Sequence, residues 1–430
     1  MTKPFETVCM VGMGYIGLPT ATVFALRSIR VIGLDVNPMA VEAVNRGETH
    51  IVEPGLDDAV RRSVQAGYLR ATLTPEPADA FLIAVPTPFQ TDQQGFVPDL
   101  TYVESAARSI APVLKPGDLV VLESTSPVGA TERMAGWLAK ERPDLSFPQT
   151  HGENSDIRIA HCPERILPGK ALEELVSNDR VIGGMTDACA TRARKLYKMV
   201  VEGDCIETDC RTAELAKLTE NSFRDVNIAF ANELSLICDR LGINVWELIR
   251  LANRHPRVNI LQPGPGVGGH CIAVDPWFIV SEAPDEARII RTAREINDHK
   301  PEWVLAKVHQ AVAEHAARHD RPAQISCFGL AFKPNIDDLR ESPALAIAAR
   351  LAEIYPGQLK IVEPFIRSLP PAMEGKAALV GVQEGLKEAD IALMLVDHDE
   401  FRATPVPVRP GLHLIDTRGV WTGHTPRPLA

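Results

Sequence analysis

A cysteine stands at the end of a glycine-rich loop in the second half of the chain. Residues 263–269 read Pro-Gly-Pro-Gly-Val-Gly-Gly, Cys271 follows two residues later, and Asp275 comes four residues after the cysteine. Four glycines and two prolines in seven residues predict an irregular loop whose backbone amides approach a ligand closely. A lone cysteine is more often a small buried hydrophobic residue. In this loop, with a carboxylate nearby, we interpret Cys271 as a nucleophile.

Three polar side chains of an earlier segment are spaced to share one face of a helix. Residues 211–241 contain no proline or glycine, and Gly242 is a suitable C-terminal stop. A helix of that length spans about 45 Å, so we expect a spine helix that links domains and contributes a homodimer contact. Lys217 and Asn221 lie four residues apart, with Arg224 three residues further on. Such a face is usually only solvated, but beside a nucleophile Lys217 and Asn221 are suited to stabilising an oxyanion.

A second glycine-rich turn lies near the N-terminus. Apolar residues 7–12 predict a buried strand, the turn Gly12-Met13-Gly14-Tyr15-Ile16-Gly17 follows, and a helical pattern begins at its end. This order is the fingerprint of dinucleotide binding, and it assigns Gly12, Gly14, Tyr15, Ile16 and Gly17 to the cofactor site. The next apolar run ends at Asp35, whose carboxylate would accept from a ribose 2′-OH and repel a 2′-phosphate, so NAD is predicted rather than NADP. A glycine turn in another kind of α/β protein is the alternative, because the bare spacing is a weak signal.

Buried strands elsewhere predict the scaffold that holds these groups. Apolar runs at 80–85 and 119–123 end in turns that contain Thr87, Thr125 and Thr131. We expect these threonines to face the cofactor, because ligands bind at the carboxyl ends of parallel strands. Taken singly, each would more often be a helix cap.

The overall pattern predicts an α/β protein of three parts. Further strands are expected at 325–332, 359–362, 391–396 and 412–416, separated by helical patterns. We therefore predict two doubly wound Rossmann-like domains, at 1–205 for NAD and at 306–430 for the substrate. A helical central domain at 206–305, with the spine helix, would join them.

The composition excludes several classes of protein. The 430 residues are 45% hydrophobic and 23% charged, which is typical of a globular chain of two or three domains. A net charge of −11 argues against a nucleic-acid surface built on bulk charge, so an anionic ligand would need a local basic cluster. The eight cysteines show no C-x-x-C pair and no zinc spacing, so we expect no metal and reduced thiols. Without a signal peptide or membrane span, we expect a cytoplasmic protein with no membrane partner.

Seven ordered motifs give the chain a resemblance to a known family. They are Gly12–Gly17, Val85–Pro88, Glu123–Gly129, Cys162–Gly169, Glu214–Asn221, Gly268–Cys271 and Phe328–Pro334. Over essentially the whole chain the sequence resembles the UDP-glucose/GDP-mannose dehydrogenase family, and residues 178–185 and 257–278 are most similar to its acetamido-sugar members. The resemblance implies oxidation of a UDP-sugar, UDP-N-acetyl-D-mannosamine in this branch, at C6 with two NAD+ through a thioester on Cys271. The product would supply surface polysaccharide synthesis.

The resemblance also implies roles for individual residues. Thr125 would hold a water near C6, Asp275 would orient Lys217 or a water, and Arg340 would reach the cofactor. The residues implied in substrate binding are Arg165, Ile166, Lys217, Asn221, Arg224, His255, Arg257, Gly268, Lys333 and Arg418. Pro168 stands where the glucose enzymes carry a carboxylate that assists thioester hydrolysis, so that role does not transfer. Arg165 is assigned instead to sugar selection.

Three other interpretations remain open at this point. A two-electron dehydrogenase of the 6-phosphogluconate or hydroxyacid type would use the lysine–asparagine helix but no nucleophile, and Cys271 argues against it. A non-catalytic NAD-responsive binding protein would not need Lys217, Asn221 and Cys271 together. Within the family, UDP-N-acetylglucosamine is the nearest competing substrate, because the two sugars differ only in the C2 configuration.

Overall fold

The structure is a computed structural model that describes residues 4–92, 95–167, 169–269, 271–405 and 410–421. The chain divides into two compact units, one of residues 1–220 and 277–284 and the other of residues 221–276 and 285–430. The fold class, α/β with Rossmann-like sheets, is confirmed. The expected division at 205 and 305 stays a prediction.

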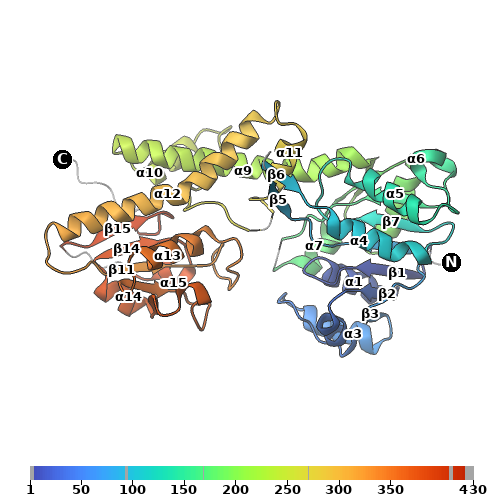
Figure 1. The fold of residues 1–430 in the computed structure, drawn as a ribbon, viewed down its shortest axis with the longest axis horizontal. Coiled ribbons are helices and arrows are strands. Elements are labelled where there is room, and N and C mark those ends of the chain that lie inside the picture. Colours follow the sequence, from blue (N-terminus) through green and yellow to red (C-terminus); the bar gives the residue numbers. More distant parts are fainter. Residues whose placement is uncertain (1–3, 93–94, 168, 270, 406–409, 422–430) are drawn as a thin grey trace. The chain divides into compact units, whose positions relative to one another are not determined.

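The first unit is built on an eight-stranded sheet with the order β10-β9-β8-β7-β4-β1-β2-β3 (Figure 1). Its neighbouring strands run parallel except for the pair β8 and β9. The strands are β1 (Thr7–Val11), β2 (Arg30–Leu34), β3 (Leu69–Thr72), β4 (Ala80–Ile83), β7 (Leu119–Leu122), β8 (Arg158–His161), β9 (Arg180–Gly184) and β10 (Cys205–Asp209). An antiparallel hairpin, β5 (Phe89–Asp92) and β6 (Gly95–Pro98), stands apart from the sheet.

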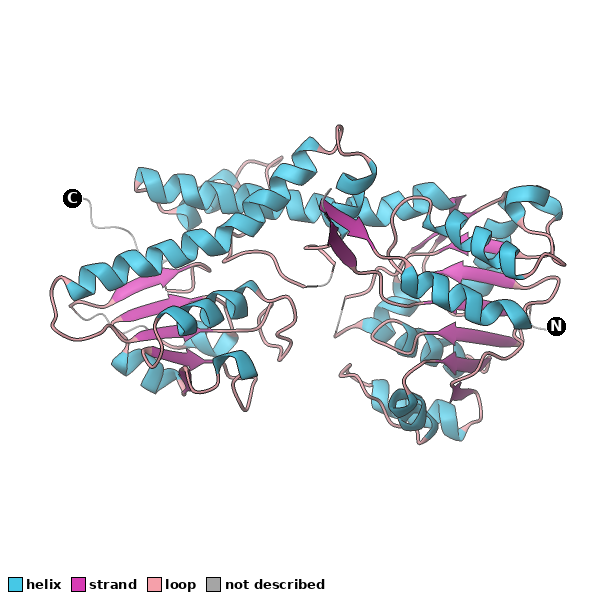
Figure 2. Ribbon diagram, viewed as in Figure 1, coloured by secondary structure: helices cyan, strands magenta, loops and turns pink. Residues whose placement is uncertain are grey.

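Helices cover both faces of this sheet (Figure 2). They are α1 (Gly17–Leu26), α2 (Pro38–Asn45), α3 (Leu56–Gln65), α4 (Thr101–Ile110), α5 (Ala130–Glu141), α6 (Pro148–His151), α7 (Ala171–Ser177) and α8 (Asp187–Tyr197), with short 3-10 turns at Ala111–Val113 and Gly152–Asn154. Alternate residues of one strand therefore enter different cores: Val8 and Met10 of β1 pack on one side of the sheet, Cys9 and Val11 on the other. Burial on both faces explains why these strands are continuous apolar runs.

The second unit holds a five-stranded parallel sheet with the order β13-β12-β11-β14-β15. Its strands are β11 (Ile325–Phe328), β12 (Leu359–Val362), β13 (Ala377–Leu379), β14 (Ile391–Met394) and β15 (His413–Asp416). The helices around it are α12 (Arg288–Ala316), α13 (Pro343–Ile354), α14 (Val382–Glu388) and α15 (Asp399–Ala403), with a 3-10 turn at Pro371–Met373. The remaining helices are α9 (Cys210–Leu241), α10 (Val245–Ala252) and α11 (Asp275–Glu282).

The expected spine helix is present as α9, which has 32 residues. It begins one residue before the predicted start and ends at Leu241, one residue before Gly242, which has a positive φ of 70°. Several predicted strands are shorter than expected, since β4 ends at Ile83 and β14 at Met394. The apolar residues that follow lie in the turns at the carboxyl ends of the sheets, where the predicted ligand-facing groups also lie.

Candidate active site

The glycine turn after β1 has the geometry that dinucleotide binding requires. Gly12 has a φ of +91°, and a methyl group on its Cα would lie 2.6 Å from the Ala84 carbonyl oxygen. A methyl group on Gly17 would lie 1.7 Å from the Gly12 carbonyl oxygen, so α1 can approach β1 this closely only without a side chain there. A methyl group on Gly14 would meet no described atom within 4 Å, which leaves the space over the turn open.

The amino end of α1 fits the phosphates of a dinucleotide. Among the described residues no side chain caps this helix, and its first turn contains no acidic residue. The positive end of the helix dipole can therefore face an anion without competition from a side-chain carboxylate. Of its first backbone groups, the Leu18 N–H already donates to the Gly14 carbonyl oxygen at 3.0 Å, and Pro19 has no N–H. The contrast is α5, where Glu214 accepts from the backbone N–H groups of Gly129 and Thr131 at 2.6 and 2.8 Å. Glu214 thus already supplies the anion at that second helix.

Asp35 lies beside the glycine turn. One carboxylate oxygen accepts from the Met13 backbone N–H at 2.8 Å, and the other accepts from the Asn37 backbone N–H at 2.8 Å. The carboxylate is held at the end of β2, and each of its oxygens keeps a second lone pair for a ribose hydroxyl. Tyr15 is exposed and Ile16 half-buried at the same turn. This arrangement supports the predicted NAD contacts.

The turns after β4 and β7 are joined by hydrogen bonds. The Thr87 hydroxyl donates to the Thr125 carbonyl oxygen at 2.6 Å, and the Ser124 hydroxyl donates to the Val85 carbonyl oxygen at 2.6 Å. Thr87 and Thr125 are both half-buried. Thr131 is completely buried, and its hydroxyl donates to Glu214 at 2.6 Å. A cofactor contact by Thr131 stays a prediction, and its present partner is a residue to which the sequence assigned no role.

A buried group of ionisable side chains includes Glu123, which precedes Thr125 by two residues. Tyr197 donates to Glu123 at 2.6 Å, and Arg180 forms an ion pair with Glu164 at 2.8 Å; all four side chains are buried. Burial, more than the nearby Glu164 carboxylate, raises the pKa of Glu123 to about 7. Glu123 could be noticed in the sequence as a charged residue directly after an apolar strand, whereas no sequence signal marks its partners.

Arg165 and Ile166 follow this group. Arg165 forms an ion pair with Glu220 at 2.6 Å and also donates to the Asp179 carbonyl oxygen at 3.3 Å. Ile166 packs against the core of the first unit. Pro168 lies outside the described residues. Both side chains are engaged with the protein itself, Arg165 in an ion pair and Ile166 in core packing, so their contacts with a substrate stay predictions.

The nucleophile candidate is exposed at the end of its loop. Cys271 is exposed, and its carbonyl oxygen accepts from the Asp275 backbone N–H at 2.8 Å, which closes the turn into α11. Asp275 is buried, and its carboxylate accepts a short hydrogen bond from the Asn221 side chain. The structure thus brings Asn221 and Asp275 together. Lys217, half-buried one helical turn before Asn221, belongs to the first unit.

The glycines of this loop pack on the segment that follows β11. A methyl group on Gly268 would lie 2.4 Å from the Glu341 carbonyl oxygen, and one on Gly266 would lie 2.9 Å from Pro343. Gly269, with a φ of +86°, faces the ring of Phe332. This packing places the segment that carries Lys333 beside the loop that carries the cysteine.

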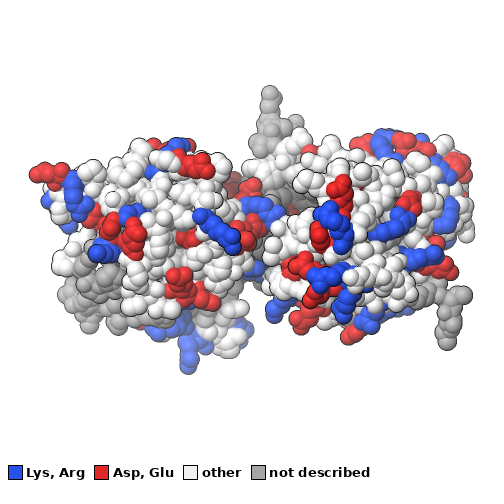
Figure 3. All heavy atoms as spheres, turned by 90° about the horizontal axis from the view of Figure 1, so that it is seen from below, with Lys and Arg blue, Asp and Glu red and all other residues white. Residues whose placement is uncertain are grey.

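The predicted basic residues differ in their surroundings. Arg224, His255 and Arg257 are exposed and Lys333 is half-exposed. Arg418 forms an ion pair with Asp397 at 2.7 Å and lies against Gly264, whereas Arg340 pairs with Asp338 at 2.6 Å. On the face drawn in Figure 3, basic and acidic side chains are interspersed. On this face, a diphosphate would therefore meet individual basic side chains and not a broad positive field.

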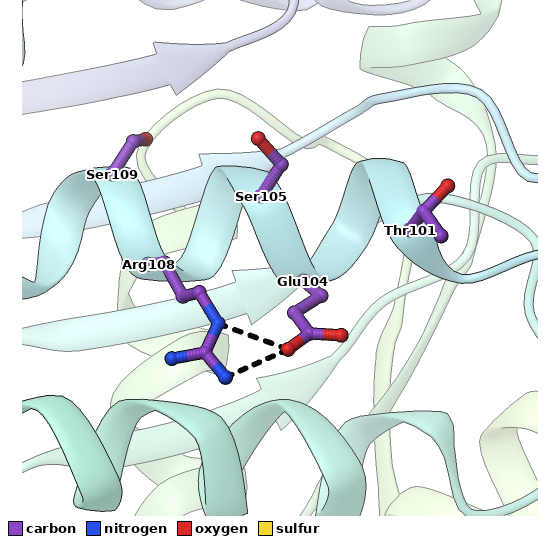
Figure 4. A pocket seen from close by; sticks show the side chains of 5 residues that line it. All are labelled: Thr101, Glu104, Ser105, Arg108 and Ser109. Carbon is purple, nitrogen blue, oxygen red and sulfur yellow. Dashed lines mark hydrogen bonds and ion pairs between the residues drawn. The ribbon is translucent and has the colours of Figure 1, made fainter.

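A shallow hollow on α4 carries none of the predicted residues (Figure 4). It is lined by Thr101, Glu104, Ser105, Arg108 and Ser109, and Arg108 donates to Glu104 from one turn away. Within the described ranges, no three His, Cys, Asp or Glu side chains are grouped to hold a metal ion. None of the described helices combines the length and the hydrophobicity that a membrane span needs.

Comparison with known proteins decides the family. Three models of the UDP-glucose/GDP-mannose dehydrogenase family match in order, the NAD binding domain at residues 6–201, the central domain at 211–299 and the UDP binding domain at 326–423. The chain belongs to the UDP-glucose/GDP-mannose dehydrogenase family. The predicted NAD cofactor and nucleotide-sugar dehydrogenase class are thereby confirmed.

Individual relatives match along the whole chain. The UDP-N-acetyl-D-mannosamine dehydrogenase of Salmonella typhi is 63% identical over 420 residues, covering 97% of this chain and 99% of its own. An NDP-N-acetyl-D-galactosaminuronic acid dehydrogenase of Ralstonia nicotianae is 62% identical over 418 residues, 97% of each chain. The solved UDP-D-ManNAc dehydrogenase of Pyrococcus horikoshii is 36% identical, with a TM-score of 0.85 over 98% of this chain and 96% of that one.

Proposed function

We propose that this chain oxidises UDP-N-acetyl-D-mannosamine at C6 to UDP-N-acetyl-D-mannosaminuronate. The observation that carries the proposal is the 63% identity, over nearly the full length, to a relative named for this substrate. The overall reaction converts a primary alcohol, two NAD+ and one water into a carboxylate, two NADH and three protons. The acidic sugar would be used in surface polysaccharide synthesis. We place the reaction in the cytoplasm, where thiols such as Cys271 are kept reduced.

Cys271 supplies the covalent step of the proposed mechanism. NAD+, held at the glycine turn, would accept a hydride from C6 in each oxidation. After the first oxidation, the Cys271 sulfur forms a C–S bond with the aldehyde carbon, and the carbonyl oxygen takes up a proton. The second oxidation leaves a thioester, and water cleaves its C–S bond to release the carboxylate and the thiol. Covalent capture keeps the aldehyde on the enzyme between the two oxidations.

Amide and ammonium groups of α9 would stabilise the charge that develops on the substrate oxygen. Asn221 is held in place by its hydrogen bond to Asp275, so its orientation is fixed before substrate arrives. We assign Lys217 to the same oxygen, and Thr125 to a water near C6. The hydrogen bond from Asn221 to Asp275 supports a role for Asp275 in orienting Asn221. The role expected from the sequence, that Asp275 orients Lys217 or a water, stays a prediction.

The remaining predicted residues are assigned to the two ligands. Exposed cations that could meet the diphosphate and sugar are Arg224, His255, Arg257 and Lys333, and Arg418 lies at the glycine loop with Gly268. Charge-assisted hydrogen bonds from such groups would offset the net charge of −11 locally. Arg340 is assigned to the cofactor. Arg165 and Ile166 are assigned to the sugar.

A second acetamido-hexosamine is the alternative substrate. The Ralstonia relative is 62% identical and is named for an N-acetyl-D-galactosaminuronic acid nucleotide. UDP-N-acetylglucosamine also differs from the mannosamine only at C2. The test is the initial rate of NADH formation with UDP-N-acetylmannosamine, UDP-N-acetylglucosamine, UDP-N-acetylgalactosamine and UDP-glucose. We expect the highest kcat/KM with UDP-N-acetylmannosamine, and a higher value for any of the other three would overturn the assignment.

We further propose a homodimer formed through α9. Phe223, Phe230 and Ile237, spaced seven residues apart, are 70%, 50% and 45% exposed. They form an apolar stripe on the side of α9 opposite to its buried polar residues. A stripe of this kind on a charged protein marks an interaction surface. Phe230→Asp should shift the mass measured by light scattering from a dimer to a monomer, whereas a wild-type monomer at micromolar concentration would contradict the proposal.

A further inference from the structure

A buried polar network joins α9, α12 and the start of the glycine loop. Arg294 of α12 forms an ion pair with Asp225 of α9 at 2.7 Å, and Asn297 donates to the same carboxylate at 2.8 Å. Asn232 donates from α9 to the Asn297 side-chain oxygen at 2.8 Å. These four side chains are each at most 2% exposed. Such a network restricts the positions of its side chains, because a buried polar group that loses its hydrogen-bond partner lowers the free energy of unfolding.

The network reaches the loop at one backbone group. The Asn232 side-chain oxygen accepts from the buried Gly264 N–H at 2.9 Å, seven residues before Cys271. Arg418 packs against the same glycine, where a methyl group would lie 2.6 Å from its guanidinium. Gly264 is therefore fixed from two sides, by an amide from α9 and by a side chain that follows β15.

The second attachment of the loop lies beyond the cysteine. There Asn221 donates to Asp275, which opens α11. Asn221 and Asn232 are eleven residues apart in α9, which is about three helical turns, so they lie on the same side of the helix. The two asparagines of one helix face thus hold the loop on both sides of Cys271.

We propose that Asn232 is a positioning residue for the Cys271 thiol: it fixes the loop at Gly264 and so holds the sulfur where it can capture the aldehyde. This inference rests on the proposed covalent mechanism. Asn232 touches neither substrate nor cofactor in this account, and it acts through the backbone of the loop. Misplacing a reacting group by about 1 Å can reduce a rate about 100-fold.

The chemical consequence is specific to a two-step oxidation. When capture is slow, the aldehyde dissociates before the C–S bond forms, so one NADH is made and the aldehyde is released. A loss of folded protein, by contrast, reduces the amount of active enzyme and leaves the number of NADH per consumed sugar unchanged. The ratio of NADH to sugar therefore separates positioning from stability.

The experiment compares Asn232→Ala with the unaltered enzyme at limiting UDP-sugar, with a hydrazine present to trap free aldehyde. We expect two NADH per sugar and no hydrazone from the unaltered enzyme. From Asn232→Ala we expect a ratio between one and two, the missing NADH matched by hydrazone, and an alkylation rate of Cys271 by iodoacetamide that changes by about 10-fold. Asn297→Ala removes the partner that orients Asn232 and supplies a second, independent variant if Asn232→Ala does not fold.

The matched control is Asn45→Ala. Asn45 also holds a backbone segment, accepting from the Ala71 N–H at 2.8 Å and donating to its carbonyl oxygen at 3.0 Å, but it lies in the first unit, between α2 and β3. Its loss should lower the melting temperature and leave two NADH per sugar. A ratio of two with no hydrazone from both Asn232→Ala and Asn297→Ala would overturn the inference alone. A ratio of one from the unaltered enzyme would overturn the proposed function, and the inference with it.

Discussion

Replacing the buried Glu123 with glutamine should make the stability of the protein less dependent on pH. Glu123 directly follows β7, accepts from Tyr197 and lies near the Glu164–Arg180 ion pair and the Cys162 thiol. Its Oε2 atom is buried and has no hydrogen-bond partner among the described residues. Burial raises its pKa from 4.5 to about 7. In Glu123→Gln the side chain keeps its shape and can still accept from Tyr197, but it no longer titrates.

The sign of the effect follows from proton binding. Between pH 4.5 and pH 7 the folded state holds a proton on Glu123 that the unfolded state has lost, so the free energy of unfolding falls as the pH rises. The destabilisation from this one group is about 1 kcal/mol at pH 5 and about 3 kcal/mol at pH 8. The unpaired amide of the glutamine costs the same at both values. We compare the free energy of unfolding of Glu123→Gln with that of the wild type at each pH. The variant's value minus the wild-type value should therefore rise by about 2 kcal/mol from pH 5 to pH 8.

Equilibrium urea unfolding of both proteins at pH 5 and pH 8 measures this difference. The exposed Glu6, which pairs with Arg30 on the surface, supplies the control. For Glu6→Gln, the difference from wild type in free energy of unfolding should change by less than about 0.5 kcal/mol between pH 5 and pH 8, because exposed ion pairs are screened by solvent. A difference between Glu123→Gln and wild type that is the same at both pH values would refute the placement of Glu123 as a buried acid.

Three further outcomes are expected at the ligand sites. Asp35→Ala should weaken NAD binding by roughly 10-fold, because a hydrogen bond to a charged group is lost, and it should relax the discrimination against NADP. Fluorescence titration with both cofactors measures this, and equal use of NAD and NADP by the wild type would contradict the role of Asp35. Gly14→Ala should fold normally and bind NAD weakly, since only the open space over the turn is filled, whereas Gly17→Ala should lower the melting temperature sharply; equal melting curves for the two would contradict the geometry of the turn. Arg165→Ala should reduce kcat/KM for UDP-N-acetylmannosamine more than for UDP-glucose, and an equal reduction would remove Arg165 from sugar selection.

The sequence predicted those parts of the fold that depend on local pattern. Strands β1, β2, β4 and β7 are visible because both of their faces are buried, which makes them continuous apolar runs. The long α9 is visible because it lacks glycine and proline and ends at Gly242. The glycine turn at 12–17 is visible because Gly12 and Gly17 leave no room for a side chain, whereas Gly14 leaves the space over the turn open.

Other parts depend on contacts that no local pattern contains. The edge strand β10 reads Cys-Ile-Glu-Thr-Asp and has no apolar run, and α12 continues through Pro301, which normally marks a helix end. The candidate active site was likewise predictable only where residue type and local spacing are sufficient. Cys271 and Asn221 follow from residue type and spacing, whereas the attachment of Asn232 to Gly264 joins residues 32 positions apart. Likewise, Glu214 and Tyr197 gain their roles only through burial beside partners distant in the sequence.

The count of NADH per sugar with Cys271→Ser tests the central claim most directly. The unaltered enzyme and the variant would each be given a limiting amount of UDP-N-acetyl-D-mannosamine and excess NAD+, and NADH would be counted by absorbance once the reaction stops. The account predicts two NADH per sugar and the uronate from the unaltered enzyme. From Cys271→Ser it predicts at most one NADH and no uronate, with NAD binding retained, because the serine oxygen does not form the thioester. Two NADH per sugar and full conversion to the uronate by Cys271→Ser would contradict covalent capture by this cysteine.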